Sequence, residues 1–144
     1  ANQIRKKIEE ENRNRRKPVF SVALGDFNVV ESEFPQSLMP LLYPSWNYRL
    51  IDLDSAARAA GFPNPPGTYY YGRDKVWNML DRVMVSNHFF ADQGIKIPIN
   101  KFKIIDTLAE GPNRFPIRYN QSTLDPNEAG YSDHFPVYFE MVAP

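Results

Sequence analysis

The stretch VWNMLDRVMVS, residues 76–86, is the clearest strand in the sequence and marks the centre of the expected fold. Its alternation places one set of side chains on the same face of an extended chain: Trp77, Met79, Asp81, Val83 and Val85. Asp81 therefore falls in the middle of an apolar stripe that a core would bury. A lone buried carboxylate is costly, so we expect Asp81 to have a hydrogen-bonding or cationic partner.

Other segments have the apolar, β-branched or aromatic character of strands: residues 19–24, 48–53, 102–108 and 135–142. The first of them, VFSVAL, is apolar almost throughout, which suits a strand covered on both faces. Gly25 is expected to end it. Three loops connect these strands: residues 31–47, 62–75 and 109–131. The last is long for a compact domain, and loops of that length often line functional sites.

Helices are expected at residues 2–16 and 55–60, with a helical turn near residues 36–42. The first is predicted to be a surface helix whose last turn holds the basic residues that offset the helix dipole: Arg13, Arg15, Arg16 and Lys17. Asp54 is expected to cap the second helix and Gly61 to end it.

Composition excludes several classes of protein. The 144 residues fit one domain, and 42% of them are hydrophobic, which is enough for a core. The absence of cysteine excludes disulfides and thiolate metal sites. No apolar run approaches the roughly 20 residues that a membrane span needs. The net charge is zero, which disfavours nonspecific binding to duplex nucleic acid, because that binding depends on many phosphate contacts.

Three short segments on strands or at strand ends carry the candidate chemistry: Gly25-Asp26-Phe27-Asn28, Leu80-Asp81-Arg82-Val83 and Ser132-Asp133-His134-Phe135-Pro136-Val137. The carboxylate and carboxamide of the first suit a site that holds a hard cation or water and a phosphate oxygen. The histidine of the third can donate to a phosphate oxygen or exchange a proton. Taken singly, each segment also has a structural explanation, as a turn, a loop cap or a paired carboxylate.

Together and in this order, the segments resemble the endonuclease/exonuclease/phosphatase superfamily, which includes deoxyribonuclease I-like nucleases, abasic-site endonucleases, sphingomyelinases and inositol polyphosphate 5-phosphatases. The resemblance covers most of the chain. It implies an α/β fold, the C-terminal half of a four-layered α/β sandwich with two packed, mainly antiparallel sheets. It also implies hydrolysis of a phosphate ester by water, by a phosphodiesterase, nuclease or phosphatase that uses magnesium or manganese.

The resemblance assigns a role to each matching residue. Asp26 would position or activate the attacking water and contribute to metal binding, and Asn28 would contact the phosphate. His134 would stabilise charge on the phosphoryl oxygens, and Asp81 would orient it. Asp133 would help to hold the metal.

The resemblance also implies that residues 1–144 lack the superfamily's N-terminal half, which supplies the Glu that is the principal metal ligand. We therefore expect this chain alone to be close to inactive. We also expect it to associate with itself or with that half through an uncovered sheet edge.

An aromatic cluster ahead of Asp81 is a candidate substrate-binding surface. Tyr69 and Arg73 would stack on or clamp a substrate, and packing of the tyrosines on a strand is the alternative. The substrate could be nucleic acid, phospholipid or a small phosphorylated molecule, and nothing indicates a compartment. A different class of function also stays open, in which the protein is a non-catalytic relative that acts as a binding or interaction module.

Overall fold

The computed structural model describes residues 1–13, 15–17, 19–43, 49–91, 94–107, 109–111, 114–117 and 132–144. Its helices are α1 (Asn2–Asn12), α2 (Met39–Leu42) and α3 (Leu53–Ala59), with short 3-10 turns η1 (Gln36–Leu38), η3 (Asn87–Phe90) and η4 (Ile99–Lys101). Its strands are β1 (Val22–Asp26), β2 (Leu50–Asp52), β3 (Tyr69–Tyr71), β4 (Val76–Asn78), β5 (Asp81–Ser86), β6 (Lys103–Ile104), β7 (Ala109–Glu110), β8 (Phe115–Pro116) and β9 (Val137–Tyr138). All the strand pairs in these ranges are antiparallel, and the chain is an α/β protein. No helix in the described part is long and apolar enough to cross a membrane.

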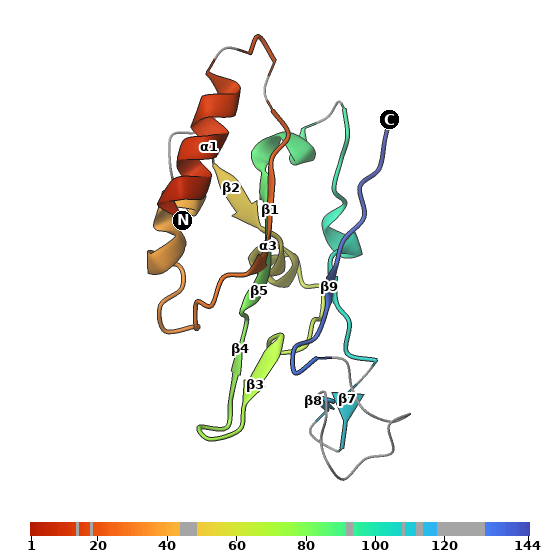
Figure 1. Ribbon diagram of the computed structural model, residues 1–144. Helices are drawn as coiled ribbons and strands as arrows, with labels where there is room; N and C mark the ends of the chain where they lie inside the picture. The colour runs from red at the N-terminus through yellow and green to blue at the C-terminus, as the bar shows by residue number, and fades with distance from the viewer. Residues whose placement is uncertain are drawn as a thin grey trace.

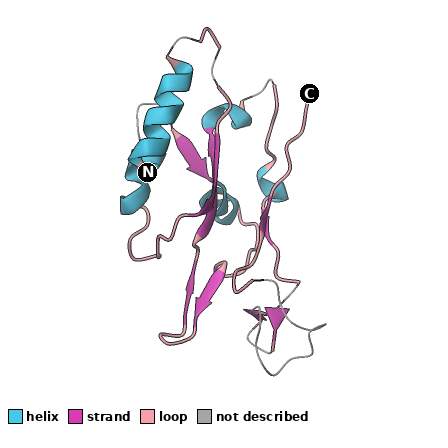
Figure 2. Cartoon of the chain, in the orientation of Figure 1, coloured by secondary structure: helices cyan, strands magenta, loops and turns pink. Residues whose placement is uncertain are grey.

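Strand β5 is the centre of the fold. It lies between β1 and β2 in a sheet of order β1-β5-β2 (Figure 1). One face of this sheet packs on α1 and α2 through an apolar cluster that includes Met84 and Leu41. The other face packs on α3 and the β6–β9 region through a cluster that includes Val83, Val85 and Phe135. Figure 2 shows α1 running alongside the central strands, and the β3–β4 hairpin extending beyond the end of β5.

The strand expected at residues 76–86 is present as two strands, β4 and β5, with Met79 and Leu80 between them. Its face pattern is confirmed, since its odd-numbered apolar residues all pack in or against one cluster. The break arises because the N–H groups of Leu80 and Asp81 donate to the hydroxyl of Thr68, at 3.2 and 3.1 Å, instead of to a neighbouring strand.

The prediction that the strand at residues 19–24 is covered on both faces is wrong. Val22 is 37% exposed and Leu24 63% exposed. The apolar cluster on that side of the sheet includes residues of β5 but, in the described part of the chain, none of β1. Gly25 lies inside β1 rather than ending it. β1 is also an edge strand of the sheet, with β5 on one side only among the described residues.

Helix α1 ends earlier than predicted, and a side chain explains why. Asn12 Nδ2 donates to the carbonyl of Ile8 at 2.8 Å, and Asn12 Oδ1 accepts the N–H of Val19 at 3.0 Å. These bonds tie the helix end to the chain that enters β1 and compete with further helical bonds. The basic residues predicted for the last turn therefore follow the helix instead of belonging to it.

Helix α3 follows β2 without a loop, and its predicted cap is wrong. The N-cap is Asp52, whose Oδ1 accepts the N–H of Ser55 at 2.8 Å, and Asp54 lies in the first turn. Gly61 takes the left-handed conformation expected just past a helix end, with φ +81°. The helical turn near residues 36–42 is confirmed by η1 and α2.

The other predicted strands are shorter than the patterns that predicted them. The residues found in strands are Leu50–Asp52, Lys103–Ile104 and Val137–Tyr138. Tyr48 and Leu108 lie outside the described residues, as does most of the predicted loop at 109–131. The described part of that loop forms the β7–β8 pair.

Candidate functional site

Asp81 and His134 form a close contact between two of the three predicted segments. His134 Nδ1 lies 2.7 Å from Asp81 Oδ2, and the two side chains are 22% and 20% exposed. An ionised carboxylate only accepts hydrogen bonds, so Nδ1 is the donor wherever this contact is a hydrogen bond to an ionised Asp81. Asp81 thus has the hydrogen-bonding partner that its place in an apolar stripe predicted. The other ring nitrogen, Nε2, remains for a further group.

Backbone contacts bring these two residues together across 53 positions of sequence. Asp81 is the first residue of β5, and His134 forms an isolated antiparallel bridge with Tyr69 at the start of β3. The hydroxyl of Ser132 accepts the N–H of His134 at 3.1 Å. The next residue, Phe135, is buried in the core, so the histidine is anchored on both sides.

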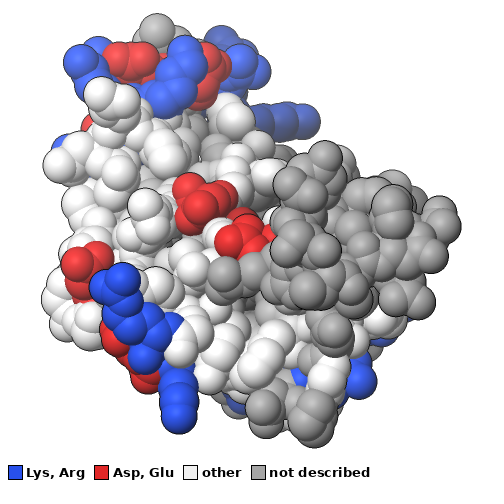
Figure 3. All heavy atoms as spheres, turned by 60° about the horizontal axis from the view of Figure 1, so that its bottom comes forward, with Lys and Arg blue, Asp and Glu red and all other residues white. Residues whose placement is uncertain are grey.

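Asp26 lies directly opposite Asp81 in the β1–β5 ladder. Side chains paired in this way project from the same face, with Cβ atoms roughly 4.5–5.5 Å apart. Two like charges in this arrangement repel each other, so the pair favours a cation or a hydrogen-bond donor near both carboxylates. Figure 3 shows acidic side chains gathered within an otherwise uncharged area of one face of the molecule.

Asn28 lies just beyond the end of β1, in a tight turn with Asp26. Its backbone is left-handed, with φ +52°, and its N–H donates to Asp26 Oδ1 at 2.8 Å. The N–H of Phe27 between them donates to the carbonyl of Leu80 at 2.9 Å. This turn is therefore held against the residue that precedes Asp81.

Tyr69 lies beside the Asp81–His134 pair. Its ring centroid is 4.9 Å from that of His134, and Tyr71, two residues along the strand, follows at 6.4 Å from Tyr69. Tyr70 points to the opposite face and stacks on Phe115 at 3.9 Å. One tyrosine of the cluster is thus a packing residue, while two line the side of the strand that faces His134.

The structure does not bring Arg73 or Asp133 into a described contact with these residues. Arg73 lies exposed in the turn between β3 and β4, and no described hydrogen bond or ion pair joins it to the pair. Asp133 is half-buried next to His134 in the chain. Within the described ranges, no three His, Cys, Asp or Glu side chains are grouped so as to hold a metal ion.

Arg82 is a polar residue whose burial the sequence did not indicate. Only 1% of its side chain is exposed, and its guanidinium contacts Asp52 at 3.4 Å and Glu31 at 3.1 Å. It also lies 3.8 Å from the ring centroid of Phe34. Arg82 therefore ties the segment that follows Asn28 to the centre of the sheet. A single arginine in a strand pattern carries no signal for this, because its acidic partners are distant in sequence.

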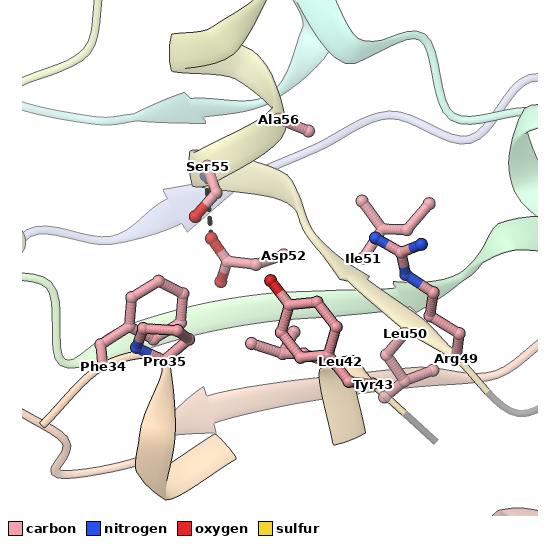
Figure 4. A pocket seen from close by; sticks show the side chains of 10 residues that line it. All are labelled: Phe34, Pro35, Leu42, Tyr43, Arg49, Leu50, Ile51, Asp52, Ser55 and Ala56. Carbon is pink, nitrogen blue, oxygen red and sulfur yellow. Dashed lines mark hydrogen bonds between the residues drawn. The ribbon is translucent and has the colours of Figure 1, made fainter. Parts of the chain in front are cut away.

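A hollow of about 300 Å³ lies on the Arg82 side of the sheet. Its lining residues are Phe34, Pro35, Leu42, Tyr43, Arg49, Leu50, Ile51, Asp52, Ser55 and Ala56 (Figure 4). The polar contact drawn there is the capping bond from Ser55 to Asp52, which belongs to the start of α3. None of these residues is among the predicted site residues, so this hollow is separate from the candidate site.

The site residues converge from three segments that are far apart in sequence. Asp81, His134 and Tyr69 are in contact, Asp26 faces Asp81 across the ladder, and Asn28 shares a turn with Asp26. Comparisons of the chain with protein-family models, with curated proteins and with solved structures found no match.

Proposed function

We propose that this chain carries one side of the active site of a metal-dependent phosphoesterase, in which water attacks a phosphate ester. The observation that supports it most is the Asp81–His134 hydrogen bond, with Asp26 paired beside Asp81. The imidazole of His134, held by Asp81, is a positioned hydrogen-bond donor, and the carboxylate of Asp26 is an acceptor for water in the same site. Hydrolysis of a phosphate ester needs both groups.

His134 contacts the phosphate in this proposal. With Nδ1–H directed to Asp81, the protonated imidazole donates Nε2–H to a phosphoryl oxygen, where it stabilises the charge that grows in the transition state. The carboxamide of Asn28, exposed at the end of β1, donates to another phosphate oxygen. Asp26 accepts a hydrogen bond from the attacking water and orients it.

Magnesium or manganese would neutralise charge on the phosphate. Carboxylate oxygens such as those of Asp26 and Asp133 are the donors that Mg²⁺ prefers. The described residues hold no group of three such ligands, so they fit only part of a cation site. We therefore assign the remaining ligands, including a Glu, to residues outside the described part of the protein.

The proposed fold is the C-terminal half of a four-layered α/β sandwich, with the N-terminal half as its partner. Two observations support it. The segment that contains β9 packs on the β5 face of the central sheet through Phe135. Val22 and Leu24 of β1 are 37% and 63% exposed, and neither belongs to the apolar cluster that contains Phe135. A second sheet laid against their face of β1 would bury both side chains.

A second candidate function is that of an interaction module without catalysis. It is favoured by the same strand: β1 is a sheet edge with an exposed apolar face, and such edges pair readily with another chain. In that case a partner strand adds to β1, and the Asp81–His134 pair only fixes the loop next to it.

Metal-dependent hydrolysis separates the two candidates. Bis-p-nitrophenyl phosphate and p-nitrophenyl phosphate are incubated with the chain, and with the longer protein expected to contain it, with magnesium, with manganese and with excess EDTA. If the protein is a phosphoesterase, the longer protein hydrolyses these esters, EDTA abolishes this activity and either metal restores it. The chain alone then shows weak or no turnover. The preferred ester separates a diesterase from a monoesterase. No turnover of these esters, or of a small panel of nucleic acids and phospholipids, would leave the interaction module.

A further inference from the structure

Thr68 is a fully buried polar residue that belongs to none of the three segments that predicted the site. Its exposed fraction is 0%. Its hydroxyl oxygen Oγ1 accepts two backbone N–H groups, from Leu80 at 3.2 Å and from Asp81 at 3.1 Å. These two groups lie at the break between β4 and β5. At Asp81, which carries the candidate carboxylate, the hydroxyl of Thr68 therefore accepts the backbone N–H in place of a neighbouring strand.

The backbone of Thr68 holds the histidine segment at the same time. Its carbonyl accepts the N–H of Phe135 at 2.7 Å, one residue after His134, and its own N–H donates to the carbonyl of Asn78 at 3.0 Å. The Gly25-Asp26-Phe27-Asn28 segment is linked through Leu80, whose carbonyl accepts the N–H of Phe27. Thr68 thus connects directly or through one residue to all three segments.

The neighbouring glycine shows how closely the chain is pressed together here. A Cβ atom built on Gly67 would lie 2.5 Å from the carbonyl oxygen of Asn78 and 2.7 Å from its carbonyl carbon. Only a glycine allows this approach. The close approach at Gly67 therefore places Thr68 against residues 78–81. The hydrogen bonds from Leu80 and Asp81 also fix the position of its hydroxyl.

We propose that Thr68 is the positioning residue of the Asp81–His134 pair. It touches no substrate in this account and acts only through the backbone of Asp81 and of Phe135. Loss of its hydroxyl leaves two buried N–H groups without an acceptor, and their movement toward other acceptors shifts Asp81 relative to the imidazole. A hydrogen bond of 2.7 Å weakens with such a shift. The catalytic meaning of this positioning rests on the proposed phosphoesterase function, whereas the positioning itself does not.

The test compares Thr68→Val, which keeps the shape and removes the acceptor, with Thr68→Ser, which keeps the hydroxyl. The chain has two histidines, so His88→Gln assigns the imidazole signals of His134 in the whole protein labelled with ¹⁵N. We expect the wild type and Thr68→Ser to show an Nδ1–H proton of His134 that is shifted downfield by the carboxylate. We expect Thr68→Val to lose that downfield proton.

Ser86→Ala is the matched control. Ser86 ends the same strand, is buried, and its hydroxyl accepts the N–H of Ser21 at 3.1 Å, so it also provides a buried acceptor, but far along β5 from the pair. Its loss should lower stability and leave the His134 signals unchanged. An unchanged downfield proton in Thr68→Val, or an equal loss in Ser86→Ala, would overturn the proposal.

Hydrogen exchange in the wild type covers the case in which Thr68→Val does not fold. The Leu80 and Asp81 amides both donate to the hydroxyl of Thr68, so that hydroxyl should account for their protection. Exchange as fast as that of exposed turn amides, such as Gly72, would contradict the proposal.

In a protein that hydrolyses the ester, Thr68→Val should lower kcat about tenfold or more with little change in KM, and Thr68→Ser should restore kcat. Absence of hydrolysis in the wild-type longer protein would count against the phosphoesterase, while the His134 signals would still decide the role of Thr68.

Discussion

Asp81 is the centre of the candidate site, because it contacts His134 and lies opposite Asp26. Its position in an apolar stripe predicted a hydrogen-bonding partner, and the structure supplies one in His134. Residue chemistry also predicted a histidine–carboxylate pair. The place of Asp26, opposite Asp81, could not be predicted, because it depends on the register of two strands that are far apart in sequence.

The negative charge of the Asp81 carboxylate, and not only the size of the side chain, should matter for activity. Asp81→Asn removes the negative charge that supports a protonated, phosphate-donating His134 in the proposed mechanism, so kcat for ester hydrolysis should fall about a hundredfold or more. Asp106→Asn is the control, since that exposed carboxylate pairs with Arg114 and has no described bond to the site residues. Rates measured with bis-p-nitrophenyl phosphate on purified, folded variants make the comparison. Equal rates for the two variants would remove Asp81 from the proposed site.

Asp54 makes stability depend on pH. Burial raises the pKa of its carboxyl above the usual value and the nearby Asp52 adds to this, while Arg58 opposes it. The folded chain therefore holds this proton more tightly than the unfolded chain. The stabilisation is complete below the unfolded pKa of about 4 and is lost as pH rises through the folded pKa.

Asp54→Asn removes this titration. Urea unfolding at a series of pH values should show the stability of the wild type, relative to Asp54→Asn, decreasing as pH rises from about 3 toward 7. A relative stability that increases with pH over this range would mean that the Arg58 ion pair outweighs the burial of Asp54.

At the scale of elements, periodicity predicted the central strand and its faces, whereas contacts between residues distant in sequence determine where the elements break. The strand at residues 76–86 is interrupted by a hydroxyl from Thr68, which no local pattern reveals. The sequence pattern predicted Asp54 as the cap of α3, and this prediction is wrong because the N-cap is Asp52. Asp52 is the cap because β2 leads into the helix without a loop.

The close approach at Gly67 gives a prediction for the β3–β4 region. Gly67→Ala places a Cβ 2.5 Å from backbone oxygen of Asn78, which cannot move without disturbing β4. The free energy of unfolding should fall by about 1–3 kcal/mol. Gly72→Ala is the matched control in the adjoining hairpin turn, where an added Cβ meets nothing within 4 Å, and it should change stability by less than about 0.5 kcal/mol. Urea unfolding that finds the two variants equal would contradict the packing described here.

At the scale of the whole molecule, the central sheet is covered unevenly. β5 is covered on both faces, while β1 exposes Val22 and Leu24 beside the candidate site. The composition of residues 19–24 predicted a strand that prefers cover on both faces, but composition does not reveal which part of a protein supplies that cover. The grouping of metal ligands could not be predicted either, because a residue type indicates a possible metal donor but not which other donors lie near it in space.

The exposed face of β1 should make the chain self-associate. Sedimentation velocity at about 100 µM should find dimers or larger species for the wild type, and mainly monomer for Leu24→Lys, because a charge on that face opposes pairing of apolar edges. Val76→Lys is the control, since Val76 is also an exposed apolar residue but lies on the separate β3–β4 sheet. A monomeric wild type, or equal dissociation by both substitutions, would contradict association through β1.

Magnesium-dependent hydrolysis of bis-p-nitrophenyl phosphate by the wild type, His134→Ala and His88→Ala tests the central claim most directly. It is measured on the longest natural form of the protein, with the folding of each variant checked by circular dichroism. His88 is the chain's other histidine and lies in η3, away from the Asp81–His134 pair. The phosphoesterase account predicts that His134→Ala lowers kcat at least about a hundredfold while His88→Ala leaves it nearly unchanged. Hydrolysis that survives in His134→Ala at the wild-type rate would contradict it.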